Sequence, residues 1–186
     1  MTEPFLALAR KYRPKKLSEL IGQDVFVSTI QNAIKSNRLA HAYLFSGVRG
    51  VGKTTIARLI ASSLNCMERK TDDPNPCGHC SNCESIARSE NIDVLEVDAA
   101  SKTGIDDIRD IIDTIKYSPT GGQYKIYIID EVHMLSKQAI NGLLKTLEEP
   151  PQFVKFIFAT TEVKKIPLTV LSRCQRFDLK RVNFDQ

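Results

Sequence analysis

The sequence predicts a single α/β domain built on buried parallel strands. Its 186 residues match the length of about one domain, and a hydrophobic content of 42% supplies a substantial core. A glycine-rich segment at residues 44–54 lies between an apolar run of strand length and a helical pattern. A second short apolar run is followed by the carboxylates Asp130 and Glu131. Both features are typical of strands whose carboxyl ends line a ligand site.

Composition and charge exclude several protein classes. The net charge is +4 and the pI is about 8.8, below the pI above ~9 that marks dedicated nucleic-acid binders. No apolar stretch approaches the ~18 residues of a membrane span, and no cationic start precedes an apolar run. We therefore expect a soluble, cytoplasmic protein that does not enter membranes. Five cysteines without an export signal favour metal binding or free thiols over disulfides.

The chain begins with a short apolar pattern that runs into a cationic stretch at residues 10–16. Pro14 should hold Arg13 outside helical geometry. The basic stretch is interpreted equally well as a solvated face or as a contact surface.

A helix is expected next, with Asp24 as its N-cap. Its spacing turns Val25, Ile30 and Ile34 toward the core. The helix is expected to end near Asn37.

A strand, a glycine loop and a helix then follow in the order that phosphate binding requires. Residues 42–45 form the expected strand and residues 55–64 the expected helix, and the segment between them fits G-x-x-x-x-G-K-[ST]. Glycines let successive backbone N–H groups point at a phosphate near the positive end of the helix. Lys53 would reach the β- and γ-phosphates, and Thr54 would offer its hydroxyl to Mg²⁺. The predicted nucleotide-binding residues here are Gly47, Val48, Arg49, Gly50, Val51, Gly52, Lys53, Thr54 and Thr55.

Four cysteines, Cys66, Cys77, Cys80 and Cys83, follow with the spacing C-x10-C-x2-C-x2-C. Two C-x-x-C steps allow four thiolates to surround one tetrahedral Zn²⁺ at ~2.3 Å each. The residues between them are polar and rich in Asp, Asn and Pro, so metal binding would fix a segment that cannot form its own core. We expect a structural zinc insert at residues 66–83.

Three alternatives to this zinc site stay open. An iron–sulfur cluster fits the C-x2-C-x2-C run, although the bacterial pattern places a further cysteine near the position of Ala87. In a second alternative His79 replaces one of the cysteines. In a third, all the thiols are free.

Residues 94–98 alternate as a strand does, and isoleucines recur at helical spacing over residues 105–115. Acidic residues lie in the early turns of that helix, where its dipole favours them. In the loop between them Ser101, Lys102 and Thr103 suit contact with the phosphate backbone of DNA. Ordinary helix capping accounts for these three residues equally well.

Residues 125–131 are an apolar run too short for a helix that ends in two acids, which predicts a buried parallel strand delivering carboxylates to the ligand edge. Asp130 would hold Mg²⁺ together with Thr54, directly or through water. Glu131 would orient and polarise a water in line with the γ-phosphate. A core strand that ends in acids by chance is the competing interpretation.

His133 and Met134 follow this strand and are interpreted as packing residues. Ser136 is then expected to cap a helix that closes at Pro150 and Pro151. The apolar face of this helix carries Ile140, Leu143, Leu144 and Leu147.

A third buried strand, residues 156–159, is followed by Thr160 and Thr161. A hydroxyl at this edge can hydrogen-bond the attacking water or the γ-phosphate, although threonines commonly end strands. Residues 168–171 predict a helical turn ahead of Arg173. An arginine at a domain surface can neutralise transition-state charge on a neighbouring subunit's nucleotide, and it can equally be an ordinary salt-bridge partner.

These residues together resemble the AAA+ ATPase module of the bacterial DNA polymerase III gamma/tau family, the motor subunits of the sliding-clamp loader. The resemblance spans essentially the entire chain. Its most specific element is a zinc insert inside an AAA+ core, because the nucleotide motifs alone occur in many NTPases. The matching segments are residues 8–14 with 22–23, 46–54, the four-cysteine insert, 129–135, 143–151 and 172–174.

The resemblance implies a P-loop NTPase of AAA+ type, with a three-layer α/β/α sandwich around a five-stranded parallel sheet. It implies ATP or ADP, Mg²⁺ and Zn²⁺ as ligands. Thr161 would be the sensor threonine, Arg173 the trans-acting finger, and the loop at residues 101–103 would face duplex DNA. The residues that would cradle adenine are Tyr12, Arg13, Ile21 and Gly22.

As a member of such a family, the chain is expected to drive opening and loading of the sliding clamp on primed DNA within a heteropentamer. Residues 1–186 would be the AAA+ domain, whereas the family's helical lid and collar lie outside this chain. The fragment is therefore expected to be monomeric, to bind nucleotide weakly and to hydrolyse it slowly. Two other functions stay open: a nucleotide-dependent binding scaffold with little ATPase activity, and another AAA+ DNA remodeller such as a branch-migration helicase.

Overall fold

The computed structural model describes residues 12–101 and 105–182 and shows one five-stranded sheet whose strands all run parallel. The strand order across the sheet is β2-β3-β4-β1-β5. The strands are β1 (Ala42–Ser46), β2 (Val94–Asp98), β3 (Lys125–Asp130), β4 (Val154–Thr160) and β5 (Gln175–Asp178).

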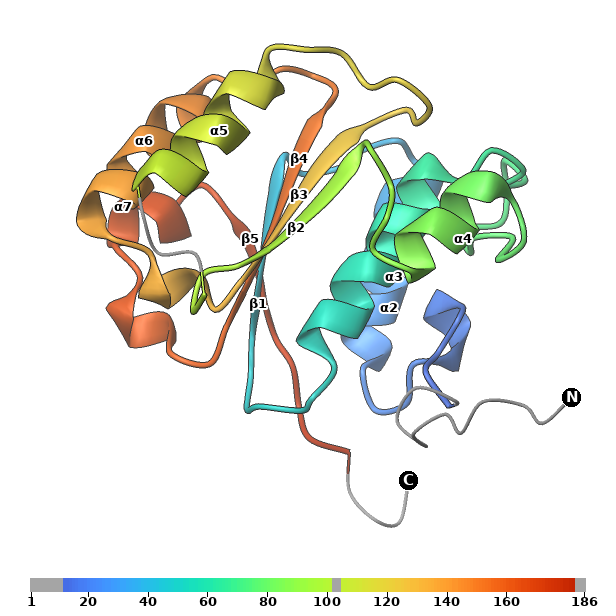
Figure 1. Ribbon diagram of the computed structural model, residues 1–186. Coiled ribbons are helices and arrows are strands. Elements are labelled where there is room, and N and C mark those ends of the chain that lie inside the picture. The colour runs from blue at the N-terminus through green and yellow to red at the C-terminus, as the bar shows by residue number, and fades with distance from the viewer. Residues whose placement is uncertain (1–11, 102–104, 183–186) are drawn as a thin grey trace, which may run out of the picture.

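Helices cover both faces of the sheet, so the three-layer α/β/α sandwich is confirmed (Figure 1). Helices α2, α3 and α4 lie on one face, and α5, α6 and α7 lie on the other. The helices are α2 (Asp24–Lys35), α3 (Lys53–Asn65), α4 (Ser81–Ala87), α5 (Ile105–Ile115), α6 (Lys137–Glu148) and α7 (Leu168–Leu171). Short 3₁₀ turns are η1 (Leu17–Glu19), η2 (Val132–Met134) and η3 (Val163–Lys165).

The central strands are buried on both faces, which explains why their sequences are almost continuously apolar. Successive side chains of a strand point to opposite faces of the sheet. In β3, Tyr127 and Ile129 pack into the core under α5 and α6, whereas Ile126 and Ile128 pack into the core under α2 and α3. All four side chains are completely buried. The short apolar runs that predicted these strands therefore serve two separate cores.

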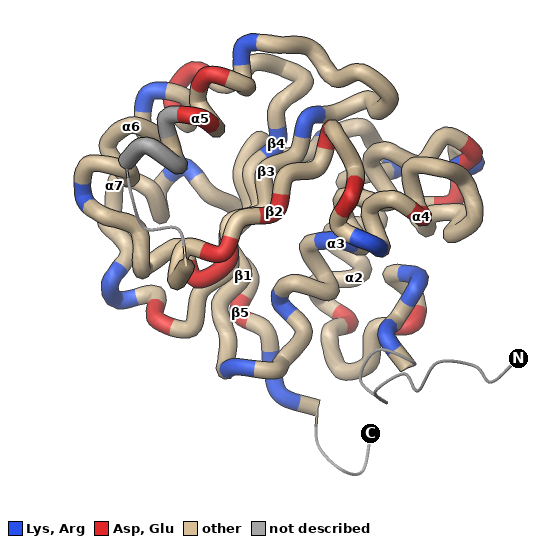
Figure 2. Tube along the Cα trace, in the orientation of Figure 1, with Lys and Arg blue, Asp and Glu red and all other residues tan. Residues whose placement is uncertain are grey.

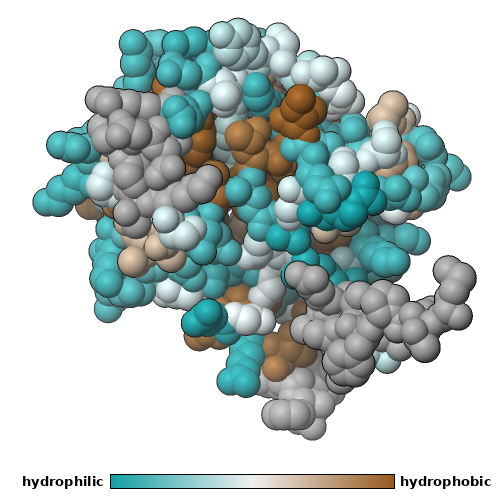
Figure 3. Space-filling view, viewed as in Figure 1, coloured by the Kyte–Doolittle hydropathy of each residue, from teal (hydrophilic) through white to brown (hydrophobic). Residues whose placement is uncertain are grey.

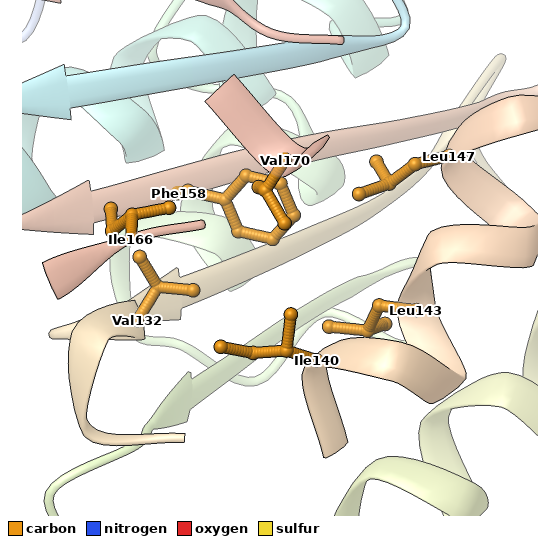
Figure 4. Close-up of a pocket in the computed structure, with 7 residues that line it drawn as sticks. All are labelled: Val132, Ile140, Leu143, Leu147, Phe158, Ile166 and Val170. Carbon is orange, nitrogen blue, oxygen red and sulfur yellow. The ribbon is translucent and has the colours of Figure 1, made fainter. Parts of the chain in front are cut away.

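A small apolar gap remains in the core beneath α6 and α7 (Figure 4). Its volume of about 10 Å³ is close to the least space that holds one water molecule. Side chains without polar atoms surround it, so a water would find no partner there. We interpret it as a packing gap and not as a ligand site. The lining residues are Val132, Ile140, Leu143, Leu147, Phe158, Ile166 and Val170.

Most of the visible surface is polar. On the face drawn in Figure 3, hydrophilic side chains cover the helices, and hydrophobic ones show mainly between the two helical layers. Among the residues that the structure describes, no helix has the length and apolar character needed to cross a membrane.

Helix α2 corrects one prediction. It begins at Asp24, with Gln23 as the N-cap residue, and ends at Lys35. Val25 was expected to face the core, but 81% of it is exposed, and Phe26 is buried in its place. Phe26 packs edge-on against the rings of Phe45 and Phe177, so the large ring one residue further along sets the buried face of the helix.

The other helix boundaries follow the predicted signals closely. Ser136 caps α6, because its hydroxyl accepts a hydrogen bond of 3.1 Å from the Ala139 N–H. The helix ends at Glu148, just ahead of Pro150. Strand β5 was expected only from the family resemblance, since its four residues are mostly exposed at the sheet edge and lack an apolar pattern.

Two asparagines, each immediately before a cysteine, tie the insert at residues 66–83 to the loop that precedes β3. Asn65 donates from Nδ2 to the Tyr124 carbonyl at 2.7 Å, and its Oδ1 accepts from the Tyr124 N–H at 2.9 Å. Asn82 donates to the Gly121 carbonyl and to the Asn65 carbonyl, both at 2.9 Å. The insert therefore rests on the sheet through side chains that adjoin its cysteines.

The same loop is held from the other side by Asp93, which is 2% exposed at the start of β2. Its carboxylate accepts from the N–H groups of Thr120, Gly121 and Gly122 at 2.7–2.8 Å. A buried carboxylate needs such partners, because leaving it without hydrogen bonds is costly. The loop leading into β3 is thus fixed by groups from α3, from α4 and from Asp93, the residue just before β2.

Gly122→Ala should destabilise the fold. A Cβ at this position would lie 2.6 Å from the Asn65 side chain and would push it off Tyr124. We expect the free energy of unfolding in urea to fall by about 1–3 kcal/mol, the cost of leaving buried polar groups without partners. The matched control is Gly121→Ala, whose Cβ would meet its nearest atoms only at 3.8 Å. Equal stability of the two variants would refute the proposed clash.

Candidate functional site

The predicted phosphate loop and the predicted acidic pair meet at one edge of the sheet. Because the strands are parallel, their carboxyl ends lie together, and Ser46 at the end of β1 pairs with Thr160 at the end of β4. Asp98 at the end of β2 pairs in the same way with Asp130 of β3. Figure 2 shows acidic positions gathered at the lower ends of the central strands.

The loop between β1 and α3 has the backbone that its glycines allow. Gly50 and Gly52 adopt φ values of +83° and +100°, which side chains rarely tolerate. Gly47 passes so close to Leu179, the residue after β5, that a Cβ on Gly47 would lie 2.9 Å from the Leu179 carbonyl oxygen. The loop ends at the first turn of α3, whose N–H groups have no partners within the helix and attract anions.

Lys53 points back into this loop. Its side chain is buried, and Nζ donates to the carbonyls of Gly47 at 3.0 Å and Val48 at 3.4 Å. A buried ammonium held only by neutral carbonyls is well placed to exchange them for an anion.

Thr54 and Asp130 contact each other directly. The Thr54 hydroxyl donates to Asp130 Oδ2 at 2.6 Å, and Asp130 Oδ1 accepts from the Glu131 N–H at 2.9 Å. A hydroxyl and a carboxylate oxygen side by side are the ligand types that Mg²⁺ prefers. The structure therefore brings together the two residues expected to share a magnesium ion.

Glu131 departs from the strand in a left-handed conformation, with φ of +47° and ψ of +46°. A residue other than glycine pays about 1–2 kcal/mol for this conformation, and such strain is concentrated at functional sites. The turn directs the carboxylate toward the end of β4, where Oε2 accepts from the N–H and the hydroxyl of Thr161, both at 3.0 Å. The predicted water-orienting acid and the predicted sensor threonine are thus direct partners.

The polar role of His133 was missed from the sequence. Its side chain is only 5% exposed, and Nδ1 lies 2.9 Å from Thr160 Oγ1 and 3.3 Å from Glu131 Oε2. Expecting His133 to pack was therefore incomplete. Expecting Met134 to pack was wrong, since 46% of it is exposed. A single histidine beside the acidic pair was the only available signal.

Arg173 lies at the amino-terminal ends of the strands, opposite the carboxyl ends where the phosphate loop lies. It precedes the first residue of β5, whereas the loop follows the last residue of the parallel strand β1. Its guanidinium pairs with Glu148 at 2.6 Å and donates to the Thr169 carbonyl at 2.6 Å. Arg173 therefore makes an ordinary salt bridge within the chain and is placed away from its own loop.

The segment proposed to cradle adenine is only partly tied to the site. Tyr12 is 73% exposed and Ile21 is 58% exposed, and Gly22 turns the chain with a φ of +71°. Arg13 and Thr55 of α3 both line a surface cleft of about 770 Å³. Of the loop expected to face DNA, Ser101 is exposed, while residues 102 and 103 lie outside the described part of the chain.

The four cysteines of the insert converge. Their sulfur atoms all lie within 4.8 Å of one another, and those of Cys77 and Cys83 are 3.9 Å apart. The N–H of Cys77 donates to the sulfur of Cys66, and the N–H of Cys80 to that of Cys77, both at 3.3 Å. This arrangement fits a tetrahedral cation with thiolate ligands. The fifth cysteine, Cys174, packs against the core beneath α6 and α7.

The protons on these thiols are unevenly held. Burial raises the pKa of Cys66 and of Cys83. Burial also opposes ionisation of Cys80, but hydrogen bonds from the backbone of Cys83 and Met67 and from neighbouring thiols outweigh it and lower its pKa to about 7. Binding of a cation would therefore displace protons from most of the set.

The chain is similar in sequence and in fold to known subunits of DNA polymerase III. A family profile described as DNA polymerase III, delta subunit, matches residues 22–183. The DNA polymerase III subunit tau/gamma of Haemophilus influenzae is 52% identical over 182 residues, which cover 98% of this chain and 26% of that protein. The chain spans only about a quarter to a half of the length of the curated relatives it matches.

Two solved structures from Thermotoga maritima share the fold. A DNA polymerase III gamma subunit-related protein aligns with a TM-score of 0.63 and 24% identity, covering 85% of this chain and 46% of that one. RuvB aligns with a TM-score of 0.57 and 22% identity, covering 92% of this chain and 49% of that one. At these identities the likeness concerns the fold alone.

The left-handed turn at Glu131 can be tested by stability. Glu131→Gly and Glu131→Ala both lose the contacts with Thr161, but only glycine tolerates the backbone without strain. We expect Glu131→Gly to be more stable to urea than Glu131→Ala by about 1 kcal/mol. Asn141, exposed within α6, is the control, because there glycine should be less stable than alanine by a similar amount. The same sign at both positions would contradict the strain.

Proposed function

The chain belongs to the DNA polymerase III, delta subunit, family, and we propose from that premise that it is the ATP-binding and hydrolysing motor module of a bacterial sliding-clamp loader. The family match and the relatives named DNA polymerase III subunits tau and gamma confirm the resemblance inferred from the sequence motifs. The branch-migration alternative has only the shared fold in its favour.

The observation that supports the proposal best is the 2.6 Å contact between Thr54 and Asp130, because it joins the loop after β1 to the acids after β3. The backbone N–H groups of the loop and Lys53 would bind the triphosphate. Thr54 and Asp130 would hold Mg²⁺, which neutralises charge on the phosphates. Glu131 would accept a proton from, and orient, the attacking water.

We assign supporting roles to residues around this centre. Thr161 would sense the γ-phosphate from the end of β4, because its hydroxyl already bonds to Glu131. Tyr12, Arg13, Ile21 and Gly22 would border the adenine.

Arg173 would serve a neighbouring subunit. Its place at the far edge of the sheet separates it from its own phosphate loop. To act it would have to leave Glu148 and face the nucleotide of the next subunit, where it would neutralise transition-state charge. The proposal therefore requires an assembly, which for this family means other clamp-loader subunits in a heteropentamer together with the sliding clamp and primed DNA in the cytoplasm. The chain alone would be a monomer.

We propose further that the insert at residues 66–83 is a structural zinc site held by Cys66, Cys77, Cys80 and Cys83. The convergence of their four sulfurs supports this ligand set. His79 is exposed and pairs with Glu68 at 3.3 Å, so it is less suited to replace a cysteine. The zinc would supply folding energy to a polar segment that is otherwise poor in core residues.

A second function deserves a test because of the placement of Arg173. Without a neighbour to supply an arginine, the chain would hold ATP or ADP as a structural ligand and hydrolyse it slowly. Such a nucleotide-dependent scaffold keeps every binding residue named above but not the catalytic role of Glu131.

Two substitutions separate binding from chemistry. We expect Lys53→Ala to weaken ATP binding at least tenfold, because a buried cation is lost from the loop. We expect Glu131→Gln to keep ATP binding but to slow single-turnover hydrolysis about 100-fold or more. Calorimetry and quenched hydrolysis with excess protein measure the two effects. Lys116→Ala and Asp113→Asn each remove one charge from an exposed ion pair elsewhere and should change neither. Unaltered affinity in Lys53→Ala would overturn the nucleotide site, and unaltered hydrolysis in Glu131→Gln would favour the scaffold.

The zinc site predicts one zinc per chain in protein purified without added metal, measured by elemental analysis. Cys83→Ser should lose the metal, whereas Cys174→Ser should retain it, because Cys174 lies outside the cluster. Release should increase as the pH falls, since protons compete for the thiolates. Iron with visible absorption, or equal zinc content in both variants, would exclude the proposed site.

A further inference from the structure

We propose that His133 is a positioning residue for hydrolysis, which holds the carboxylate of Glu131 in the orientation that it needs to polarise water. The inference deepens the proposed ATPase function and rests on it. It concerns a side chain whose polar partners within the described residues, Thr160, Glu131 and Glu162, belong neither to the phosphate loop nor to the residues expected to bind magnesium.

His133 stands between the ends of two strands. It lies in η2, directly after the left-handed turn of Glu131, and its ring reaches across to the end of β4. Nδ1 lies 2.9 Å from Thr160 Oγ1 and 3.3 Å from Glu131 Oε2. Nε2 lies 3.5 Å from Glu162 Oε1. A ring that is 95% withdrawn from solvent is thus surrounded by oxygen atoms, which is not the environment of a purely packing residue.

The partners of Nδ1 decide where its proton belongs. Glu131 Oε2 belongs to a carboxylate, which when ionised can only accept hydrogen bonds. Thr160 Oγ1 already accepts from the Glu162 N–H at 3.0 Å and has a second lone pair to offer. A proton on Nδ1 can be donated to Thr160 Oγ1 and also lies beside the carboxylate, whereas an unprotonated Nδ1 would face the carboxylate with its lone pair. The geometry therefore makes His133 a donor toward Glu131.

This donor completes a set that fixes one oxygen of Glu131. Oε2 is approached by the N–H and the hydroxyl of Thr161 and by Nδ1 of His133. Within the described part of the chain, Oε1 has no hydrogen-bond partner, so it is the oxygen left to accept a proton from water. Two hydrogen bonds from Thr161, just after β4, and the nearby Nδ1 of His133 in η2 orient the carboxylate through one oxygen before substrate arrives. Loss of His133 would release part of that hold.

Substituting His133 by asparagine or by glutamine shows which of its two ring nitrogens is needed. The side-chain amide of Asn reaches about as far as Nδ1, and that of Gln about as far as Nε2. We expect His133→Asn to keep most of the single-turnover rate. His133→Gln and His133→Ala should lower it about 10- to 100-fold while ATP affinity stays within twofold, since losing a group that orients a catalytic residue typically costs this much. Met134→Ala, at an exposed neighbour in the same turn, should match the unsubstituted chain.

A double variant tests whether His133 acts through Glu131. In Glu131→Gln the carboxylate is gone, so adding His133→Gln should slow hydrolysis no further. Additive losses, or equal losses in His133→Asn and His133→Gln, would overturn the positioning role. Thermal melts of every variant identify losses that come from unfolding. If Glu131→Gln leaves hydrolysis unchanged, the proposed ATPase function fails. If Glu131→Gln is impaired and all the His133 variants are unimpaired, only the positioning role fails.

Discussion

The hydrogen bond between Thr54 and Asp130 is the constraint on which the rest of the site depends. Thr54 lies in α3, which follows β1, and Asp130 is the last residue of β3, while β4 lies between β1 and β3 in the sheet. They can meet only because all three strands are parallel and end at the same edge, so that a helix starting there reaches across the intervening strand. The buried hydrophobic strands are therefore what brings a hydroxyl and a carboxylate, 76 residues apart in sequence, within 2.6 Å.

Two polar residues at the carboxyl edge of the sheet are held in arrangements that cost stability. Glu131 holds a left-handed backbone, and Lys53 is buried against carbonyls. Each feature costs stability in the absence of a ligand, and each is overcome by the rigid sheet beneath it. Both residues lie at the carboxyl edge of the sheet, where the proposed nucleotide would use them. At the opposite ends of the strands, Arg173 and Glu148 form an ordinary salt bridge.

Much of this arrangement was predictable from local patterns, and the remainder required distances that patterns do not contain. Apolar runs of strand length gave β1, β3 and β4, and G-x-x-x-x-G-K-[ST] gave the loop, because a phosphate cradle needs those residues consecutively. Val25 was misplaced because it lies five residues before Ile30, whereas Phe26 lies four residues before it and so fits helical spacing better. Two polar partners of His133, Thr160 and Glu162, lie 27 and 29 residues away at the end of β4 and just after it, beyond any local signal. The salt bridge of Arg173 is likewise formed with a residue 25 positions away.

The attachment of the cysteine insert has a bearing on how such chains diverge. Asn65 and Asn82 adjoin two of the cysteines and fasten the turn that leads into the strand carrying Asp130. Whatever the thiols bind, the insert therefore helps to hold the loop that leads into β3. A lineage that lost Asn65 and Asn82 with the cysteines would keep Asp93 as a support for residues 120–122 but would lose the hydrogen bonds to the backbone of Gly121 and Tyr124. We therefore expect Asn65 and Asn82 to be replaced in relatives that lack the four cysteines.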